Sequence, residues 1–261
     1  MSEPVVPDPT PGCGLILGGT AEARQLAALA TATGLPVISS LAGRVSRPAL
    51  PVGAVRIGGF GGAGGLAEFL RTHRIRAVVD ATHPFAATMS ANAATACTGN
   101  GIPILRLARP GWADRADAMN WQWVDSTQEA AAIVERLGRR AFLTTGRQTL
   151  SEFRALDAQF VLVRVVEPPE APLPAGWEVV QDRGPYSLAG ELELMRSAAI
   201  EVLVTKNSGG SYTSAKLDAA KELGVAVIVV RRPLPNEVVA EVDSPAAALR
   251  WFADRLTAAS L

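Results

Sequence analysis

The sequence predicts an α/β protein of two Rossmann-like domains with mainly parallel sheets. Short apolar runs rich in β-branched residues alternate with Ala- and Leu-rich stretches of helical periodicity along most of the chain. Fully apolar strands separated by helices indicate parallel sheets covered on both faces. The alternation is interrupted at residues 109–120, where Pro, Gly and mixed charges indicate a linker.

This linker divides the chain into two halves, preceded by a leader. Residues 1–13 are polar and Pro-rich, and we expect them to be disordered. Residues 14–110 are predicted to form an N-terminal Rossmann-like domain, and residues 111–261 a C-terminal Rossmann-like domain. The sequence leaves open whether the terminal strand or helix returns to the first domain.

The apolar runs predict strands, and the helical patterns between them predict helices. The first helix is predicted because Thr20 is a suitable N-cap and the apolar residues that follow share one face. We expect strands at 15–19, 37–40, 55–59, 77–82, 102–108, 121–126, 141–146, 160–166, 177–181, 202–205 and 225–231. We expect helices at 20–33, 62–73, 84–99, 127–137, 187–199, 213–223 and 244–258.

Composition excludes several classes of protein. The 25 basic residues balance 25 acidic residues, which argues against a nucleic-acid binder that neutralises phosphates. Two cysteines and two histidines give neither a disulfide framework nor a zinc cluster, so no metal site is expected. The chain has no signal-peptide pattern and no uninterrupted apolar stretch of about 18 residues, so we expect a cytoplasmic protein without membrane contact.

The first strand ends in a glycine-rich turn, Gly18-Gly19-Thr20, from which the first helix begins. Glycines at such a turn let the backbone approach a pyrophosphate, and the helix N-terminus supplies N–H groups and a positive dipole end. Ala23 stands where a third glycine of the dinucleotide fingerprint would lie. The turn therefore fits either a dinucleotide site or an ordinary tight connection.

The segments after the second and third strands add to this hypothesis. The second strand ends in Ser40-Leu41-Ala42-Gly43-Arg44, with Arg47 nearby and no acidic residue. An arginine at this position accommodates the 2′-phosphate of NADP, whereas an acid would favour NAD. The glycine-rich stretch that begins at Gly58 permits close backbone approach to a ligand, although a mobile surface loop is the alternative.

The fourth strand leads into Asp80-Ala81-Thr82-His83-Pro84. Ala81, Thr82 and His83 are expected to pack beside the cofactor, while Asp80 is expected to cap the turn. His83 is also a candidate proton donor, although a lone histidine is more often structural.

Two polar clusters follow strands of the second half, at the ends where open α/β sheets bind ligands. Hydroxyls, glycines and basic side chains there suit an anionic substrate, although each cluster is also compatible with a capped turn. The predicted substrate-binding residues are Thr144, Thr145, Gly146, Arg147, Lys206, Asn207, Ser208, Gly209, Gly210 and Lys216.

Arginines near the strand ends and connections suggest a polycarboxylate ligand, because guanidinium pairs with carboxylate through two parallel hydrogen bonds. Surface arginines are the default alternative for each of them. The arginines in question are Arg106, Arg109, Arg164, Arg183, Arg231 and Arg232.

Taken together, these motifs resemble the precorrin-6A reductase family of cobalamin biosynthesis. The resemblance runs in order from residue 14 to about 235, and the co-occurrence of four motifs makes it specific. These are DATHPFA (80–86), TTGR (144–147), GPYS (184–187) and TKNSGG (205–210).

The resemblance implies NADPH-dependent reduction of one double bond in a polycarboxylated tetrapyrrole, precorrin-6A, to give precorrin-6B. It also implies an active site in the interdomain cleft, between an N-terminal NADP-binding domain (14–110) and a C-terminal substrate domain (111–261). Lys206, His83 and Tyr212 remain as unranked candidates for the proton donor. Neighbouring pathway enzymes would be transient partners. Two other functions use similar folds: a non-catalytic NADP-sensing regulator, and a two-domain glycosyltransferase that binds a nucleotide-sugar.

Overall fold

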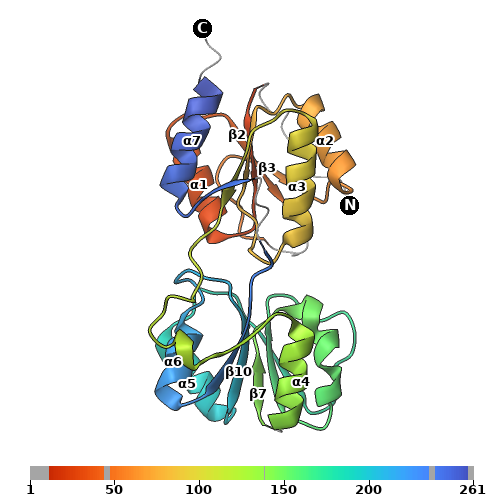
Figure 1. Ribbon diagram of the computed structural model, residues 1–261, viewed down its shortest axis with the longest axis vertical. Coiled ribbons are helices and arrows are strands. Elements are labelled where there is room, and N and C mark those ends of the chain that lie inside the picture. The colour runs from red at the N-terminus through yellow and green to blue at the C-terminus, as the bar shows by residue number, and fades with distance from the viewer. Residues whose placement is uncertain (1–11, 44–47, 138, 235–238, 258–261) are drawn as a thin grey trace. The chain divides into compact units, whose positions relative to one another are not determined.

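The computed structural model describes residues 12–43, 48–137, 139–234 and 239–257 (Figure 1). The chain forms two compact units. The first unit contains the residues up to Arg109 together with those from Pro233 onward, and the second unit runs from Pro110 to Arg232. The C-terminal segment therefore packs with the N-terminal half of the chain.

The first unit is built on a six-stranded sheet in the order β12-β5-β4-β1-β2-β3, in which every pair of neighbours is parallel. Its central strands are fully buried because helices cover both faces. The strands are β1 (Gly14–Leu17), β2 (Val37–Leu41), β3 (Ala54–Ile57), β4 (Ala77–Asp80), β5 (Ile104–Leu107) and β12 (Ala240–Val242).

Four helices cover this sheet, two on each face (Figure 1). Helices α1 (Ala21–Ala32) and α7 (Pro245–Thr257) pack on one face, and α2 (Ala63–Thr72) and α3 (Ala87–Gly99) pack on the other. Helix α7 lies close to the first strand, because a Cβ at Gly14 would lie 2.8 Å from Phe252 Cε1. The glycine thus makes room for a buried aromatic side chain.

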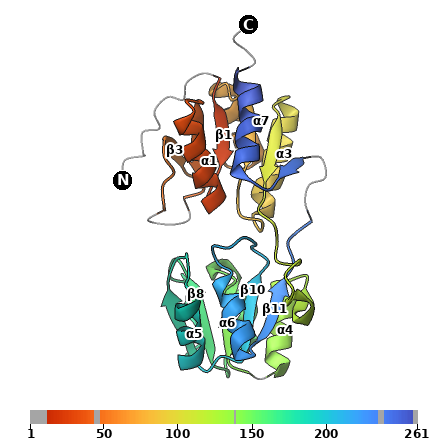
Figure 2. The same cartoon turned by 90° about the vertical axis from the view of Figure 1, so that its left-hand side faces the viewer.

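The second unit contains another parallel six-stranded sheet, in the order β6-β11-β10-β7-β8-β9. Helix α4 (Thr127–Leu137) lies on one face, and α5 (Leu188–Ser197) and α6 (Ala215–Leu223) lie on the other (Figures 1 and 2). The strands are β6 (Gln122–Val124), β7 (Ala141–Leu143), β8 (Val161–Val165), β9 (Trp177–Gln181), β10 (Val202–Lys206) and β11 (Ala226–Val230).

The predicted α/β class with parallel sheets is confirmed, and several element boundaries differ. Strand β12 was not predicted, because its three residues are partly exposed and carry no apolar run. Two 3₁₀ segments, η1 (Ala118–Asn120) and η2 (Arg147–Leu156), were also not predicted. The third helix begins at Ala87 and not at 84, because Ala86 donates its N–H to the His83 carbonyl in a preceding turn.

Candidate functional site

Each sheet has one point at which the chain order reverses, and the predicted motifs flank both points. In the first sheet, connections from β1 run toward β2 and β3, whereas those from β4 run toward β5 on the other side. In the second sheet, the same reversal lies between β7 and β10. Open α/β sheets bind ligands beyond the carboxyl ends of the strands at such a reversal.

The turn after β1 has the backbone that close approach of a ligand requires. Gly19 has φ of +117°, and nothing lies within 4 Å of a Cβ built on it. Thr20 caps α1, because its Oγ1 accepts from the Ala23 N–H at 3.1 Å. The same hydroxyl donates to the Ala81 carbonyl at 2.9 Å and so fastens this turn to the loop after β4.

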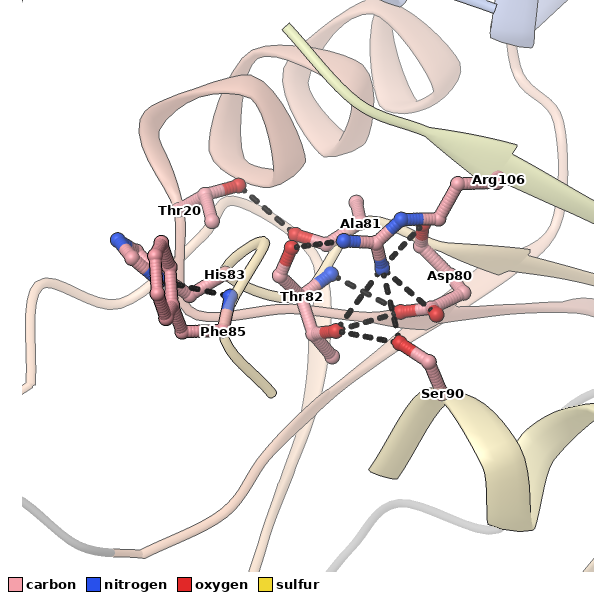
Figure 3. A network of polar contacts seen from close by, with 8 residues as sticks. All are labelled: Thr20, Asp80, Ala81, Thr82, His83, Phe85, Ser90 and Arg106. Atoms are coloured by element: carbon pink, nitrogen blue, oxygen red, sulfur yellow. Dashed lines mark hydrogen bonds and ion pairs between the residues drawn. The ribbon is translucent and has the colours of Figure 1, made fainter. Parts of the chain in front are cut away.

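A buried ion pair fixes the loop after β4 (Figure 3). Arg106 of β5 contacts Asp80 of β4 at 2.7 Å, and both side chains are largely buried. Asp80 Oδ1 accepts from the Thr82 N–H and hydroxyl at 3.1 and 2.7 Å, as expected for a residue that caps the turn. Arg106 also donates to Thr82 and to Ser90 Oγ.

His83 follows this network directly. Its Nδ1 accepts the Phe85 N–H at 3.2 Å, which leaves Nε2 as the nitrogen that carries the proton in the neutral ring. Its ring lies 5.8 Å from that of Phe85, at a tilt of 41° (Figure 3). The loop therefore holds the imidazole in one orientation, close to the turn that follows β1.

The loops after β2 and β3 lie against each other. Gly58 donates its N–H to the Leu41 carbonyl at 2.8 Å, and a Cβ at Gly43 would lie 3.5 Å from the Gly58 backbone. Ser40 is buried, and Ala42 lies in the loop directly after β2. The predicted cofactor residue Arg44, and Arg47 with it, lie outside the described residues.

In the second unit, the turn after β7 is tied to its neighbour β10. Thr144 donates both its N–H and its hydroxyl to the Val204 carbonyl, at 2.9 and 3.0 Å. Thr145 is buried and accepts a hydrogen bond from Thr149. Gly146 has φ of +86°, a conformation that favours glycine, and precedes Arg147, whose side chain is partly exposed.

The segment after β10 is fastened to residues 110–112. Asn207 accepts the Trp112 N–H at 2.9 Å, and Gly210 donates its N–H to the Pro110 carbonyl at 3.1 Å. Arg232 donates to the carbonyls of Asn207 and Ser208. The Asn207 side chain therefore holds the segment in shape, and a Cβ at Gly209 would collide with the Pro110 carbonyl oxygen.

Two predicted lysines of the second unit have different surroundings. Lys216 is only 4% exposed, and its Nζ donates to the Thr213 carbonyl at 2.9 Å and lies 5.1 Å from the centre of the Trp112 ring. Burial lowers the pKa of Lys206 from its ordinary value of 10.5, while the Glu152 carboxylate acts in the opposite direction. Tyr212 is 40% exposed.

Sequence reasoning did not single out Glu152 or Arg56. Glu152 belongs to the η2 segment, whose Leu150, Phe153 and Leu156 are buried. Arg56 of β3 donates to Ser40 and to the glycine-rich loop. The only available signal for Arg56 was its position two residues before the glycine run.

Most of the arginines expected to bind carboxylates of a ligand contact residues of their own unit. Arg106 pairs with Asp80, Arg109 with Glu22 and Arg164 with Glu191, each at 2.7 Å. The Arg164–Glu191 pair is almost completely buried. Arg164 therefore does not match the expectation that these arginines point toward a ligand. Arg183 is exposed.

Comparison with known proteins gives the same family as the motifs. Residues 15–253 match the family model described as precorrin-6x reductase CbiJ/CobK. The chain belongs to this family. The precorrin-6A reductase of Rhodococcus erythropolis is 50% identical over 238 residues, covering 91% of this chain and 96% of the relative. The precorrin-6A reductase of Mycobacterium tuberculosis H37Rv is 50% identical over 240 residues, covering 92% and 96%.

A solved structure supports the fold. The structure titled CobK precorrin-6A reductase superposes with a TM-score of 0.85 at 39% identity, covering 93% of this chain and 96% of that one. A more distant relative, the cobalt-precorrin-6A reductase of Salmonella typhimurium, is 30% identical over 260 residues, covering 93% and 95%. None of the helices in the described part of the chain is long and apolar enough to cross a membrane.

The ion pair between Arg106 and Asp80 leads to a testable prediction about stability. Replacing Arg106 by Ala leaves the buried Asp80 carboxylate without its cation, which typically costs about 3–5 kcal/mol. We expect Arg106→Ala to lower the free energy of unfolding of the first unit by about this amount in urea titration. Arg231→Ala, which removes an exposed ion pair with Asp125, is the matched control and should cost less than about 1 kcal/mol. Equal effects of the two variants would contradict the role given to the buried pair.

Proposed function

We propose that this chain reduces one double bond of precorrin-6A with NADPH, giving precorrin-6B in cobalamin biosynthesis. The observation that carries the proposal is the family match over residues 15–253, which contains the motifs at both chain reversals. Membership of a reductase family implies a nicotinamide cofactor. The choice of NADPH and the roles of individual residues belong to the proposal.

The first unit fits the nucleotide. The open space over Gly19 and the N-terminus of α1 suit a pyrophosphate, which accepts hydrogen bonds from backbone N–H groups. Ser40, Ala42, Gly43 and Gly58 then line the ribose end, and Arg44 directly follows Gly43 in the sequence. A basic residue and no acid at this position favours NADPH over NADH.

The nicotinamide ring belongs near Ala81, Thr82 and His83 in this proposal, and when bound it supplies a hydride. The chain's own contribution is to hold this loop in one conformation. The Thr20 bond to Ala81 and the Asp80–Arg106 pair do so without covalent chemistry. Rigid positioning is the main protein contribution expected in hydride transfer.

The second unit supplies the surface for the tetrapyrrole. The Thr144–Arg147 turn and the Lys206–Gly210 segment follow the neighbouring strands β7 and β10, and Arg147 and Lys206 supply cations for an anionic ligand. Carboxylates are recognised by such groups through charge-assisted hydrogen bonds. Lys216 has a supporting role in this proposal, because its ammonium group is buried beneath Trp112.

Reduction of a double bond also needs a proton, and Lys206 is the donor we favour. Burial lowers the pKa of its ammonium group and brings it closer to the working pH, where a general acid is most effective. The Glu152 carboxylate acts in the opposite direction, because its negative charge stabilises the protonated ammonium group of Lys206. Tyr212 and His83 are the remaining candidates.

Titration with NADPH followed by addition of precorrin-6A tests the function. The expected result is NADPH binding, then loss of its near-ultraviolet absorbance only after the tetrapyrrole is added. NADPH binding without oxidation would indicate the alternative of an NADP-sensing regulator. Binding of a nucleotide-sugar and not of NADPH would indicate the glycosyltransferase alternative.

The pH dependence of kcat tests the proton donor. With Lys206 as the proton donor, we expect kcat to fall as the pH rises through the pKa of Lys206, which lies below 10.5. Lys206→Met should lower kcat by about 100-fold or more, as for loss of a general acid, and remove this limb. Lys221→Met, at an exposed lysine of α6, is the control. An unchanged basic limb in Lys206→Met would assign the proton to another group.

A further inference from the structure

Arg56 occupies a distinctive position in the first sheet. It is the neighbour of Ser40 in the register between β3 and β2, close to the carboxyl ends of both strands. Its Nη1 donates to Ser40 Oγ at 3.3 Å and to the Gly58 carbonyl at 2.5 Å, and its Nη2 donates to the Gly59 carbonyl at 2.8 Å. One guanidinium group thus joins the end of β2 to the glycine-rich loop after β3.

Two aromatic rings fix the plane and position of this guanidinium group. Its central carbon lies 4.0 Å from the centre of the Phe60 ring and 5.4 Å from that of Phe69. The two rings meet edge to face at 5.2 Å. Partial burial lowers the pKa of Arg56 from its ordinary value, but a guanidinium group remains charged. The result is a preorganised positive charge.

The charge of Arg56 has no carboxylate partner among the residues that the structure describes. Four other arginines with limited exposure contact a carboxylate within 3 Å, namely Arg106, Arg109, Arg115 and Arg164. The side chains of Arg76 and Arg140, like that of Arg56, donate to carbonyl oxygens, but neither of these two lies at the carboxyl end of a strand. The Arg56 side chain donates to a hydroxyl and two carbonyl oxygens, which carry only partial charges. An anion at this place would therefore gain a charge interaction that the protein itself does not satisfy.

The position of Arg56 at the end of β2 and β3 indicates which anion would bind there. The end of the second strand in a dinucleotide-binding sheet lies next to the adenosine ribose, where NADP carries its 2′-phosphate. We propose that Arg56, with the Ser40 hydroxyl that it holds, is a specificity-determining residue that recognises the 2′-phosphate of NADPH. This inference rests on the proposed function. It concerns the choice between NADPH and NADH and not the reduction itself.

The alternative role for Arg56 is purely architectural. A residue that only shapes the Gly58–Gly59 loop would affect both nucleotides equally, because both carry the same adenosine and pyrophosphate groups. A residue whose charge meets the 2′-phosphate would affect NADPH alone. The ratio of the two dissociation constants separates these roles, and it does not depend on turnover.

The test is nucleotide binding to the full chain, followed by the fluorescence of the reduced nicotinamide. We expect Arg56→Met to raise the Kd for NADPH at least about tenfold, the size of a lost charge-assisted contact, while the Kd for NADH changes less than about threefold. Arg56→Lys, which keeps the charge but loses the planar geometry, should retain part of the preference. Arg71→Met removes an exposed arginine of α2 that pairs with Glu68, and it is the control for net charge.

Ser40→Ala provides a second variant if Arg56→Met does not fold. It removes only the hydroxyl, and it should weaken NADPH more than NADH. Equal weakening of both nucleotides in either variant would overturn the assignment while leaving the proposed function intact. A wild-type protein that binds neither nucleotide would contradict the proposed function and this inference together.

Discussion

The ion pair between Arg106 and Asp80 joins two neighbouring strands of the first sheet at the point where both strands end. Asp80 is 2% exposed, and its carboxylate also receives both hydrogen-bond donors of Thr82. A buried pair of this kind adds little net stability over an apolar contact, but it strongly disfavours any conformation that separates the charges. The loop that leads to His83 is consequently held in one shape, together with the Thr20 turn bonded to it.

The two units share a sheet topology but differ in the residues that follow their strands. Both sheets reverse their chain order between two central strands, and both carry glycine and hydroxyl residues at that place. The first unit offers backbone N–H groups and the Arg56 charge, which suit a phosphorylated nucleotide. The second unit offers Arg147 and Lys206 beside hydroxyl groups, which suit an acidic tetrapyrrole. In the proposed function, one fold supplies two binding surfaces that differ in the chemistry of their loops.

Much of this organisation could be predicted from the sequence, since it depends on local patterns. The burial of the α1 face, the Thr20 cap and the capping by Asp80 follow from periodicity and residue type. Strand β12 could not be predicted, because it forms only by pairing with the distant β5. The inward orientation of Arg164 and the link from Arg56 to Ser40 were also inaccessible, because they depend on which strands become neighbours. The assignments of cofactor, substrate and catalytic residues remain predictions.

A crystal structure of the protein with NADPH tests most directly whether the loop held by Asp80 and Arg106 serves the cofactor. We expect the pyrophosphate to lie over Gly18–Thr20 and the nicotinamide ring to contact the Ala81–His83 backbone. The side chains of Asp80 and Arg106 should keep the contact present in the protein alone. A nucleotide bound at the strand ends of the second unit, or a nicotinamide ring away from this loop, would contradict a role of this loop in cofactor binding.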